Sequence, residues 1–521
     1  MTTAIDVWGD YFTIAKWQAV VVDALESGGS EPIVNINPND TREFDAIFLG
    51  GGAAGRFGAA YCRALGGRVL IIDRWPFLGG SCPHQACVPH HLFSDCAAQL
   101  MLERTFSGKL WFQNLNDKMV SIKNIVELFR NGRTGPHAVM NYQSKEQLGL
   151  EFVLNAEFSI VDPQTIQVGE CKFQAKNLVL ALGAKPLDTN IPGTKLNGVF
   201  NSKTLVEQLD YEPAKTIVVI GGGKSAIEYG CFFNAVGRRT LVVARHQVMP
   251  IIKDVESRAY AILMMEEQGI EFLENAELMA IQGDSQDKVK SVSIKTSSGI
   301  INVDTDFVFM GIGEQANSEQ ITQTLSLETG EKGFIKVNRH MQTSIPNIYA
   351  VGDVTGPPME MFKARKEGVC AAKNIMGQVS EYQAADYPDF MHTHYEVCWL
   401  GLSEEEARQR HANVKIMKLP PDNPNGLDVG LPAGDRMMLY LMAKPRMSGF
   451  QKLIIDGDTR KILGAFHIGY GAKDGFQYLN YLIKKGLTID DLAEMDELFI
   501  SPSYFIQLCR LRAGDPHFKD M

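Results

Sequence analysis

The stretch "FDAIFLGGGAAGRFGAAYCRALGGRVLIID", residues 44–73, has the order of a strand, a glycine turn, a helix and a second strand. Its first apolar run ends at Leu49, and Gly50, Gly52 and Gly55 follow in the turn. Small residues at these spacings allow a tight turn, a close approach of a pyrophosphate to the backbone, and close packing of the helix on the strand. The free N–H groups at the start of that helix face the phosphates. This stretch therefore predicts a dinucleotide site in an α/β domain.

The same plan recurs in "KTIVVIGGGKSAIEYGCFFNAVGRRTLVVAR", residues 215–245, with Gly221, Gly223 and Ala226 in the turn. One G-x-G-x-x-G pattern is weak evidence, but two copies, each between strand-like runs, predict two dinucleotide sites. The alternative is that both segments are tight turns between a strand and a helix, and bind no ligand.

The ends of the second strands distinguish the two nucleotides. Asp73 lies 23 residues after Gly50, where a carboxylate accepts hydrogen bonds from a ribose diol. Arg245 lies 24 residues after Gly221, where a cation suits the 2′-phosphate of NADP. We therefore expect NADPH rather than NADH at the second site.

Two later segments favour a flavin, as FAD, at the first site. The segment "NLVLALGAKP", residues 177–186, is typical of a buried strand that runs into a glycine turn. The segment "TSIPNIYAVGDVTG", residues 343–356, is typical of a strand that ends at Gly352 and Asp353. An aspartate there can hold the ribityl hydroxyls, although Gly-Asp is also common in plain turns. The order of these segments implies that the second nucleotide unit is inserted into the first.

The segment "GGSCPHQACVPHH", residues 79–91, places Cys82 and Cys87 five positions apart, just after the first dinucleotide stretch. On one uninterrupted helix, residues five apart lie about 140° apart around the axis and about 7.5 Å apart along it. A bridge between them therefore needs a bent first turn. Because the free N–H groups at a helix N-terminus favour a thiolate, we interpret the pair as redox-active.

A zinc site and a static disulfide are the competing interpretations of the cysteines. No second C-x-x-C or H-x-x-x-H lies at ligand spacing in the chain, so we expect no metal. Nine cysteines, mostly scattered over 521 residues, do not form a secreted disulfide framework. A reducing cytosol fits this cysteine usage better and disfavours a static bridge.

Composition excludes several classes of function. A chain of 521 residues is too long for one ordinary domain. Its formal net charge of −10 argues against a nucleic-acid surface, because phosphate binding draws on Lys and Arg. The chain shows neither a signal-peptide pattern nor an apolar run long enough to span a membrane. We expect a cytoplasmic protein that binds neither nucleic acid nor a membrane.

Together, these motifs resemble the flavin disulfide oxidoreductases, the family of glutathione reductase, lipoamide dehydrogenase and mercuric reductase. The resemblance covers about residues 43–514. It implies two Rossmann-like domains, one inserted in the other, and a C-terminal α+β domain that forms a homodimer with a shared active site. The implied parts are an extension over residues 1–42, an FAD-binding domain over 43–190 and 302–380, an NADPH-binding domain over 191–301, and an interface domain over 381–521.

The resemblance also implies an electron path from NADPH through FAD to the cysteines. In it, Cys82 would meet the substrate and Cys87 would lie on the flavin side. One segment departs from the family pattern His-Pro-Thr-x-x-Glu: in "ELFISPSYFIQLCRLRAG", residues 497–514, Ser501 replaces the histidine and Ile506 replaces the glutamate. Neither side chain can do that acid–base work. Loss of the acid suits a carbanion that must stay unprotonated, whereas an inactive relative is the alternative.

Several segments resemble one subfamily, the carboxylating 2-oxopropyl-coenzyme M reductases. Among them are "DRWPFLGGSCPHQACVPHHLFSDCAA", residues 73–98, and "RTGPHAVMNYQSKEQL", residues 133–148. The resemblance implies that Cys82 attacks the thioether sulfur of 2-ketopropyl-coenzyme M and releases the enolate of acetone. The enolate would capture CO2 to give acetoacetate, after which NADPH regenerates the dithiol and free coenzyme M.

The subfamily resemblance implies further site residues. Arg56 and Arg365 would bind the sulfonate, since guanidinium groups suit tetrahedral oxyanions, although each also fits a solvated helix face. His137 and Met140 would line the pocket, but a methionine at helical spacing is more often part of a core. His84, inside the cysteine loop, is either a site group or a polar residue at a helix start.

The C-terminal block leaves the outcome of the reaction open. Phe499 would exclude water from the enolate, but Tyr504 stands where the carboxylating enzymes carry a histidine. A tyrosine can stabilise an enolate oxygen, or it can protonate carbon and release acetone. Gln507 can bind a carbonyl or carboxylate. Carboxylation is the first interpretation, followed by protonation or use of another organosulfur substrate, and then by a nucleotide-binding protein without catalysis.

Overall fold

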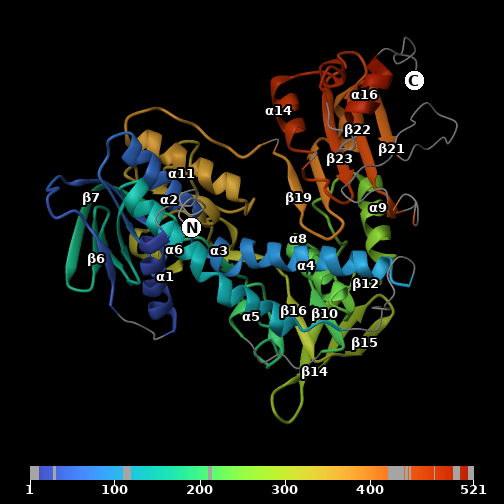
Figure 1. Ribbon diagram of the computed structural model, residues 1–521, viewed down its shortest axis with the longest axis horizontal. Coiled ribbons are helices and arrows are strands. Elements are labelled where there is room, and N and C mark those ends of the chain that lie inside the picture. The colour runs from blue at the N-terminus through green and yellow to red at the C-terminus, as the bar shows by residue number, and fades with distance from the viewer. Residues whose placement is uncertain are drawn as a thin grey trace.

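In the part of the chain that the structure describes, separate sheets define three regions (Figure 1). The first region lies on the left of Figure 1, the second at lower right and the third at upper right. The computed structural model describes residues 11–26, 31–108, 119–208, 214–385, 387–419, 439–440, 444, 447–474, 476–496 and 505–513.

The first sheet has a parallel centre of buried apolar strands. Strand β2 (Phe44–Leu49) pairs in parallel with β3 (Val69–Ile72) on one side and with β7 (Cys171–Leu180) on the other. Runs of Ile, Leu and Val suit such strands, because both faces of the sheet are covered. The other strands of this sheet are β1 (Ile33–Asn35), β4 (Glu151–Leu154), β5 (Ser159–Asp162), β6 (Thr165–Val168) and β18 (Ile348–Ala350).

Helices cover this sheet, and some of them reach from the first region toward the second (Figure 1). Helix α2 (Ala53–Ala64) follows the first glycine turn and packs on α11 (Met361–Ile375). Helix α1 (Tyr11–Glu26), which lies in the predicted extension, packs on α6 (Thr134–Tyr142), and Gln18 donates a 3.0 Å hydrogen bond to Thr134. Other helices here are α3 (Ser81–Gln85), α4 (Cys87–Thr105), α5 (Ile122–Gly132), the π-helix η1 (Gln143–Gln147), α10 (Glu319–Leu325) and the 3-10 helices η2 (Glu331–Gly333) and η3 (Gly352–Thr355).

The second sheet is parallel and carries the second glycine turn. Strand β10 (Thr216–Ile220) pairs with β11 (Arg239–Val243) and with β16 (Phe307–Met310). The sheet therefore extends to Met310, beyond the boundary predicted at residue 301. The remaining elements of this region are β9 (Val199–Phe200), α7 (Thr204–Glu207), α8 (Lys224–Ala235), α9 (Val255–Glu266), β12 (Ile270–Leu273), the antiparallel strands β13 (Glu277–Gly283), β14 (Val289–Thr296) and β15 (Gly299–Asp304), and the connecting pair β8 (Ala184–Pro186) and β17 (Glu314–Ala316).

The third sheet is antiparallel and is accompanied by helices, which fits the α+β domain expected at the C-terminus. Its order is β19-β20-β23-β22-β21, and apolar side chains of its strands and helices form one core. Its strands are β19 (Asp389–Met391), β20 (Val397–Gly401), β21 (Val414–Leu419), β22 (Phe450–Asp456) and β23 (Ile462–Ile468). Its helices are α12 (Glu404–Arg410), α14 (Gln477–Lys485), α15 (Ile489–Ala493) and α16 (Phe505–Ala513).

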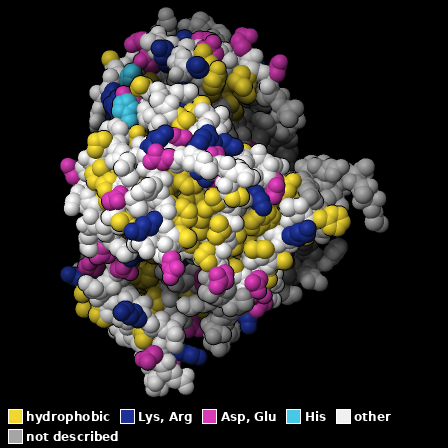
Figure 2. Space-filling view, turned by 90° about the vertical axis from the view of Figure 1, so that its left-hand side faces the viewer, with side chains coloured by type: hydrophobic (Ala, Val, Ile, Leu, Met, Phe, Trp, Pro, Cys, Tyr) yellow, Lys and Arg dark blue, Asp and Glu magenta, His cyan; other side chains and the backbone are white. Residues whose placement is uncertain are grey.

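Charged side chains of both signs are interspersed with hydrophobic ones on one face of the molecule (Figure 2). Figure 2 shows the side of the molecule on the left of Figure 1, where hydrophobic side chains gather near the centre. Among the described residues in that view, Lys and Arg are scattered between Asp and Glu rather than gathered in one block. None of the described helices combines the length and the apolar character that a bilayer-spanning segment needs.

A buried ionic cluster joins the second and third regions. The Nζ of Lys452 on β22 lies 3.0 Å from Asp254 and 2.7 Å from Glu404. Asp254 also caps α9 by accepting a 2.9 Å hydrogen bond from the N–H of Ser257. Against the opposing effect of burial, Glu404 and Asp254 raise the pKa of Lys452. Since Lys452 and Asp254 are both fully buried, removal of one partner leaves an uncompensated charge.

We predict that Lys452→Met lowers the free energy of unfolding by about 3 kcal/mol, because Asp254 and Glu404 lose their buried cation. Arg239→Ala is the matched control, since it breaks an exposed pair with Glu271 and should cost less than about 1 kcal/mol. Urea unfolding of both variants measures the difference. Equal costs for the two variants would show that the buried cluster does not hold the two regions together.

Candidate functional site

One cavity connects the predicted nucleotide turns with the cysteine pair. Its volume is about 1890 Å³, and it lies where the first and second regions meet. The predicted residues that line it are Gly50, Gly52, Asp73, Cys82, Cys87, Gly221, Gly223, Arg245 and Asp353. The structure thus brings together residues that lie up to about 300 positions apart in the sequence.

The first turn has the shape that a pyrophosphate needs. Gly50 has a φ of +110°, and a Cβ placed on Gly55 would lie 1.9 Å from the carbonyl oxygen of Gly50. Gly52 is the N-cap of α2 and supplies no side-chain cap, so the first N–H groups of the helix have no side-chain partner at that position. A phosphate oxygen suits such donors.

Asp73 closes the first turn from the end of β3. Its Oδ2 accepts a 2.6 Å hydrogen bond from the N–H of Gly51, and its Oδ1 accepts one of 2.9 Å from Trp75. Burial raises the pKa of Asp73 against the opposing effect of these two donors. Each carboxylate oxygen keeps a further lone pair, so the residue fits the predicted ribose diol.

The second turn repeats this geometry at the start of α8. A Cβ on Gly221 would lie 2.2 Å from the carbonyl oxygen of Gly311, and one on Gly223 would meet nothing within 4 Å. Ala226 packs directly against Gly311. Gly223 therefore leaves open space at an uncapped helix start, as a dinucleotide requires. Arg245 lies two residues beyond β11, exposed and at the cavity wall.

Asp353 faces the cavity from the 3-10 helix η3. Glu367 of α11 fixes this turn, because it accepts hydrogen bonds from the N–H of Gly352 at 2.7 Å and from Thr355 at 3.1 Å. Lys363 donates to the carbonyl oxygen of Gly352 at 3.1 Å. Burial, with Glu314 nearby, raises the pKa of Asp353 to about 6. The aspartate is thus held beside the first turn, where the ribityl chain is predicted.

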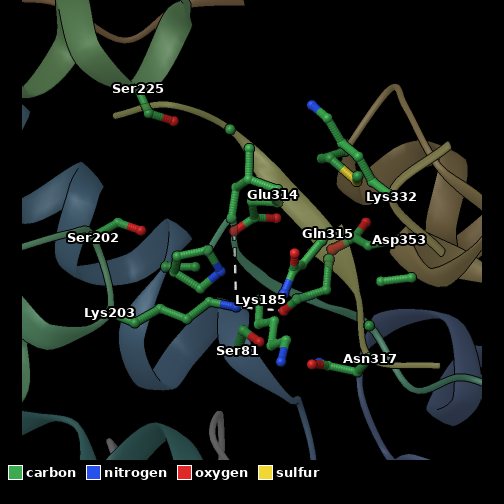
Figure 3. A pocket seen from close by; sticks show the side chains of 18 of the residues that line it. Ser81, Lys185, Ser202, Lys203, Ser225, Glu314, Gln315, Asn317, Lys332 and Asp353 are labelled. Carbon is green, nitrogen blue, oxygen red and sulfur yellow. Dashed lines mark hydrogen bonds and ion pairs between the residues drawn. The ribbon is translucent and has the colours of Figure 1, made fainter. Parts of the chain in front are cut away.

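Sequence reasoning missed a lysine on the opposite wall of the cavity. Figure 3 shows Lys203 pointing toward Glu314, with Asp353 on the strand side of the pocket. The Nζ of Lys203 lies 3.8 Å from Glu314 and donates to the carbonyl oxygen of Ala184. Burial lowers the pKa of Lys203. Its only sequence signal is its position after the short strand β9, which does not distinguish it from a surface lysine.

The cysteines face one another across a break between two helices. Cys82 lies in α3, whereas Cys87 is the first residue of α4, and Ala86 between them has φ −129° and ψ −95°. This break supplies the bend that the five-residue spacing requires. The two thiols are hydrogen-bonded to each other, which lowers the pKa of Cys82 and raises that of Cys87. Arg365 adds to the lowering at Cys82.

Two arginines come together near Cys82, although neither lines the cavity itself. Arg56 on α2 donates from Nε to Ser144 at 2.8 Å and from Nη2 to Gln143 at 3.2 Å. Burial and the nearby charge of Arg365 lower the pKa of Arg56. The guanidinium of Arg365 lies 4.6 Å from the ring centre of Phe57. Within the described residues, neither arginine has a carboxylate partner in an ion pair.

His84 and His137 lie against each other and outside the cavity wall. His84 Nδ1 is 3.2 Å from His137 Nε2, and the rings of His137 and Phe77 stack at 3.8 Å. Burial lowers the pKa of each imidazole to about 3, so both are neutral near pH 7. Met140 is also behind the wall, with its sulfur against Gly79.

The three C-terminal predictions lie outside what the structure describes. Phe499 and Tyr504 fall in residues 497–504, and the side chain of Gln507 is likewise not described. Ile506 is buried in the apolar core of the third region. Among the described residues, no group of three or more His, Cys, Asp and Glu could hold a metal ion.

A family model for pyridine nucleotide-disulphide oxidoreductases matches residues 44–368. The chain belongs to this family. A second model, the dimerisation domain of the same family, matches residues 387–507. The family uses FAD and NAD(P)H, and the two turns described above have the form that these dinucleotides require.

Individual relatives agree with the family assignment. The mercuric reductase of Staphylococcus aureus is 24% identical over 493 residues, which is 93% of this chain and 85% of that protein. The dihydrolipoyl dehydrogenase of Chlamydia pneumoniae is 27% identical over 462 residues, which is 87% of this chain and 93% of that protein. The flavoprotein disulfide reductase RclA from Escherichia coli, solved as a Cu(II) complex, matches 90% of this chain and 100% of its own with a TM-score of 0.75 and 18% identity. That likeness shows the glutathione-reductase-like fold.

We predict that Gly223→Ala raises the KM for the nicotinamide nucleotide about tenfold while the content of bound FAD stays unchanged. The added methyl group enters open space without a clash, but it occupies the position where the backbone meets the pyrophosphate. Steady-state kinetics and the flavin-to-protein absorbance ratio measure the two quantities. Gly132→Ala, whose Cβ also meets nothing, is the control and should change neither; an unaltered KM in Gly223→Ala would remove the second turn from the site.

Proposed function

We propose that this protein is an NADPH-dependent flavin disulfide oxidoreductase that reductively cleaves the thioether of 2-ketopropyl-coenzyme M and carboxylates the resulting enolate to acetoacetate. Family membership supports the redox chemistry of the cysteines. The exposed Arg245 at the cavity wall supports NADPH, since a cation there suits a 2′-phosphate. The dimerisation domain supports a homodimer in which the partner subunit completes the site.

The observation that carries the substrate class is the pair of guanidinium groups of Arg56 and Arg365, of which Arg365 acts electrostatically on Cys82. Arg56 and Arg365 act on each other electrostatically and lack a carboxylate partner among the described residues. Two such charges repel unless an anion joins them. A sulfonate can accept hydrogen bonds from both, and the proposed substrate carries its thioether on the same chain as that sulfonate.

Cys82 has the character of the attacking group. Its pKa is lowered by the hydrogen bond from Cys87 and by Arg365, against the opposing effect of burial, and a thiolate is the reactive form of cysteine. Attack on the thioether sulfur forms a mixed disulfide with coenzyme M, breaks the C–S bond and leaves its electron pair on the enolate of acetone. Cys87 then displaces coenzyme M as a thiolate and forms the Cys82–Cys87 disulfide.

Regeneration of the thiols and capture of CO2 complete the balance. Bound FAD supplies the electronic link between the nucleotide and the cysteines. Two electrons from NADPH reduce the disulfide, and the enolate carbon forms its new bond with CO2. The sum is thioether, NADPH and CO2 giving acetoacetate, coenzyme M thiolate, NADP⁺ and one proton.

Side chains that cannot act as acids near pH 7 support survival of a carbanion. His84 and His137 are neutral at pH 7, because burial lowers the pKa of each to about 3. Ile506, aligned with a family glutamate, has no proton to give and is buried. Tyr504 supports the second candidate, in which the enolate is protonated to acetone or another organosulfur compound is cleaved, since a phenol can donate a proton.

We predict that the enzyme incorporates labelled bicarbonate into acetoacetate when it is incubated with NADPH and 2-ketopropyl-coenzyme M. Tyr504→His should raise the ratio of acetoacetate to acetone, because a histidine stands at this position in the carboxylating enzymes that the sequence resembles. Product analysis by chromatography gives the ratio. Acetone without label in the native enzyme would favour the second candidate, and no cleavage at all would exclude both for this substrate.

We predict that Arg365→Ala raises the KM for 2-ketopropyl-coenzyme M by about 10- to 100-fold, since one charge-assisted hydrogen bond contributes about 1.5–3 kcal/mol. Bleaching of the flavin by NADPH should keep its native rate. Lys366→Ala, the next cation on α11, is the control, because its Nζ lies 5.8 Å from the ring centre of Tyr382 rather than beside Arg56. Equal KM values in the two variants would remove the sulfonate from the proposal.

A further inference from the structure

A histidine and a glutamate meet between the helix of Cys87 and the helix of the second nucleotide turn. His90 Nε2 on α4 lies 3.4 Å from Glu228 Oε2 on α8. His90 stands one turn after Cys87, so both side chains project from one face of α4, and both line the cavity. Glu228 lies on α8, whose first residue, Lys224, directly follows Gly223 of the second nucleotide turn. The pair thus connects the cysteines with the nucleotide turn.

One polar atom of the His90–Glu228 pair lacks a hydrogen bond to the described residues. Glu228 is 7% exposed, and its Oε1 accepts a 2.7 Å hydrogen bond from the N–H of His392. The buried His90 Nε2 makes no hydrogen bond to any described residue. A buried carboxylate is stabilised when the imidazole opposite gains a proton. Such a pair stores one proton at a fixed place.

The proposed reaction needs a group that can hold one proton away from the enolate. Reduction of the Cys82–Cys87 disulfide by one hydride equivalent from NADPH gives one thiol and one thiolate, so one proton enters with the two electrons. Carboxylation does not consume this proton, because CO2 takes the position on carbon that a proton would otherwise occupy. If the proton stays on a thiol beside the enolate, acetone forms instead of acetoacetate.

We propose that His90, paired with Glu228, holds the proton that arrives when the nicotinamide nucleotide reduces the cysteines. Once Cys82 is joined in the mixed disulfide, the proton passes from the Cys87 thiol to the imidazole of His90, and Glu228 stabilises the imidazolium. Arg56 and Arg365 lie on other helices, α2 and α11, in the first region. His90 instead faces α8, which begins at the nucleotide turn. The inference rests on the cysteine chemistry of the proposed function, and its consequence for the enolate follows from that chemistry.

The other charged and titratable groups around His90 are less suited to hold this proton. On α4 the neighbours of His90 are Cys87 and His91, whose pKa burial lowers. On α8, the ring of Tyr229 stacks on His90 at 5.4 Å, and Lys224 is already paired with Glu360 and Asp389. On β19 and just beyond it, burial lowers the pKa of His392 to about 2; Asp95, Glu396 and Lys473 lie around His392.

The test is the protonation of His90 in the two redox states of the FAD-loaded enzyme. Hydrogen–deuterium exchange at the imidazole C2, followed by mass spectrometry with fragmentation between His84, His90 and His91, reports each histidine separately. We expect the exchange rate at the imidazole C2 of His90 to change on reduction with dithiothreitol, because reduction puts a negative charge on the cysteine pair. His340, which contacts the carbonyl oxygen of Ser380, is the control and should not respond. An equal exchange rate of His90 in both states would overturn the inference.

Variants separate this inference from the proposed function. Glu228→Gln keeps the acceptor for His392 but removes the charge, and it should abolish at least half of the redox-dependent change in exchange at His90. His90→Gln should raise the ratio of acetone to acetoacetate at least threefold. A redox-linked change in exchange at His90 without any cleavage of 2-ketopropyl-coenzyme M would support the role of His90 and refute the proposed substrate. Labelled acetoacetate with an unresponsive His90 would refute the proposed role of His90 and support the proposed substrate.

Discussion

The chemistry of this protein depends on the interruption of one helical segment at Ala86. Without it, Cys82 and Cys87 would project from different sides of one helix, about 7.5 Å apart along the axis. The break lets the two thiols share a hydrogen bond and makes Cys87 the first residue of α4. That helix then continues from the first region to the second, as Figure 1 shows, and carries His90 to Glu228. One backbone feature thereby places the cysteines and aligns them with both nucleotide turns.

Charge is distributed unevenly around the cysteines. Toward α2 and α11, two arginines lack carboxylate partners among the described residues and favour an anionic ligand. Toward α8 and β19, carboxylates lie beside the basic groups that the structure describes there: Lys224 lies 2.5 Å from Asp389, and Glu228 faces His90. An anion is therefore attracted to the first side, whereas a proton is better stabilised on the second.

Local sequence patterns predicted the parts of the fold that local physics controls. The glycine turns need only a strand, small residues and a helix start, so Gly50, Gly55, Gly221 and Gly223 could be assigned from spacing alone. The membership of β16 in the second sheet could not, because its parallel pairing with β10 joins strands about 90 residues apart. Likewise, packing on Phe77 places His84 and His137 behind the cavity wall, and the sequence carries no sign of that burial. The contact of His90 with Glu228 was missed for the same reason, since it joins two helices 138 positions apart in the chain.

Absence of an acid is not enough to protect a carbanion. The replacement of a histidine and a glutamate by Ser501 and Ile506 removes one proton source. Burial lowers the pKa of His84 and of His137, so both imidazoles are neutral near pH 7. In the proposed reaction, reduction of the disulfide by the nicotinamide nucleotide nevertheless brings a new proton into the cavity with every turnover. A thiol would be a poor place for this proton, because the proposed mechanism requires Cys82 as a thiolate to attack and Cys87 as a thiolate to displace coenzyme M. The proposed base on the nucleotide side would satisfy both demands, since it would remove the proton along the path by which the hydride equivalent entered and would leave the enolate to react with CO2.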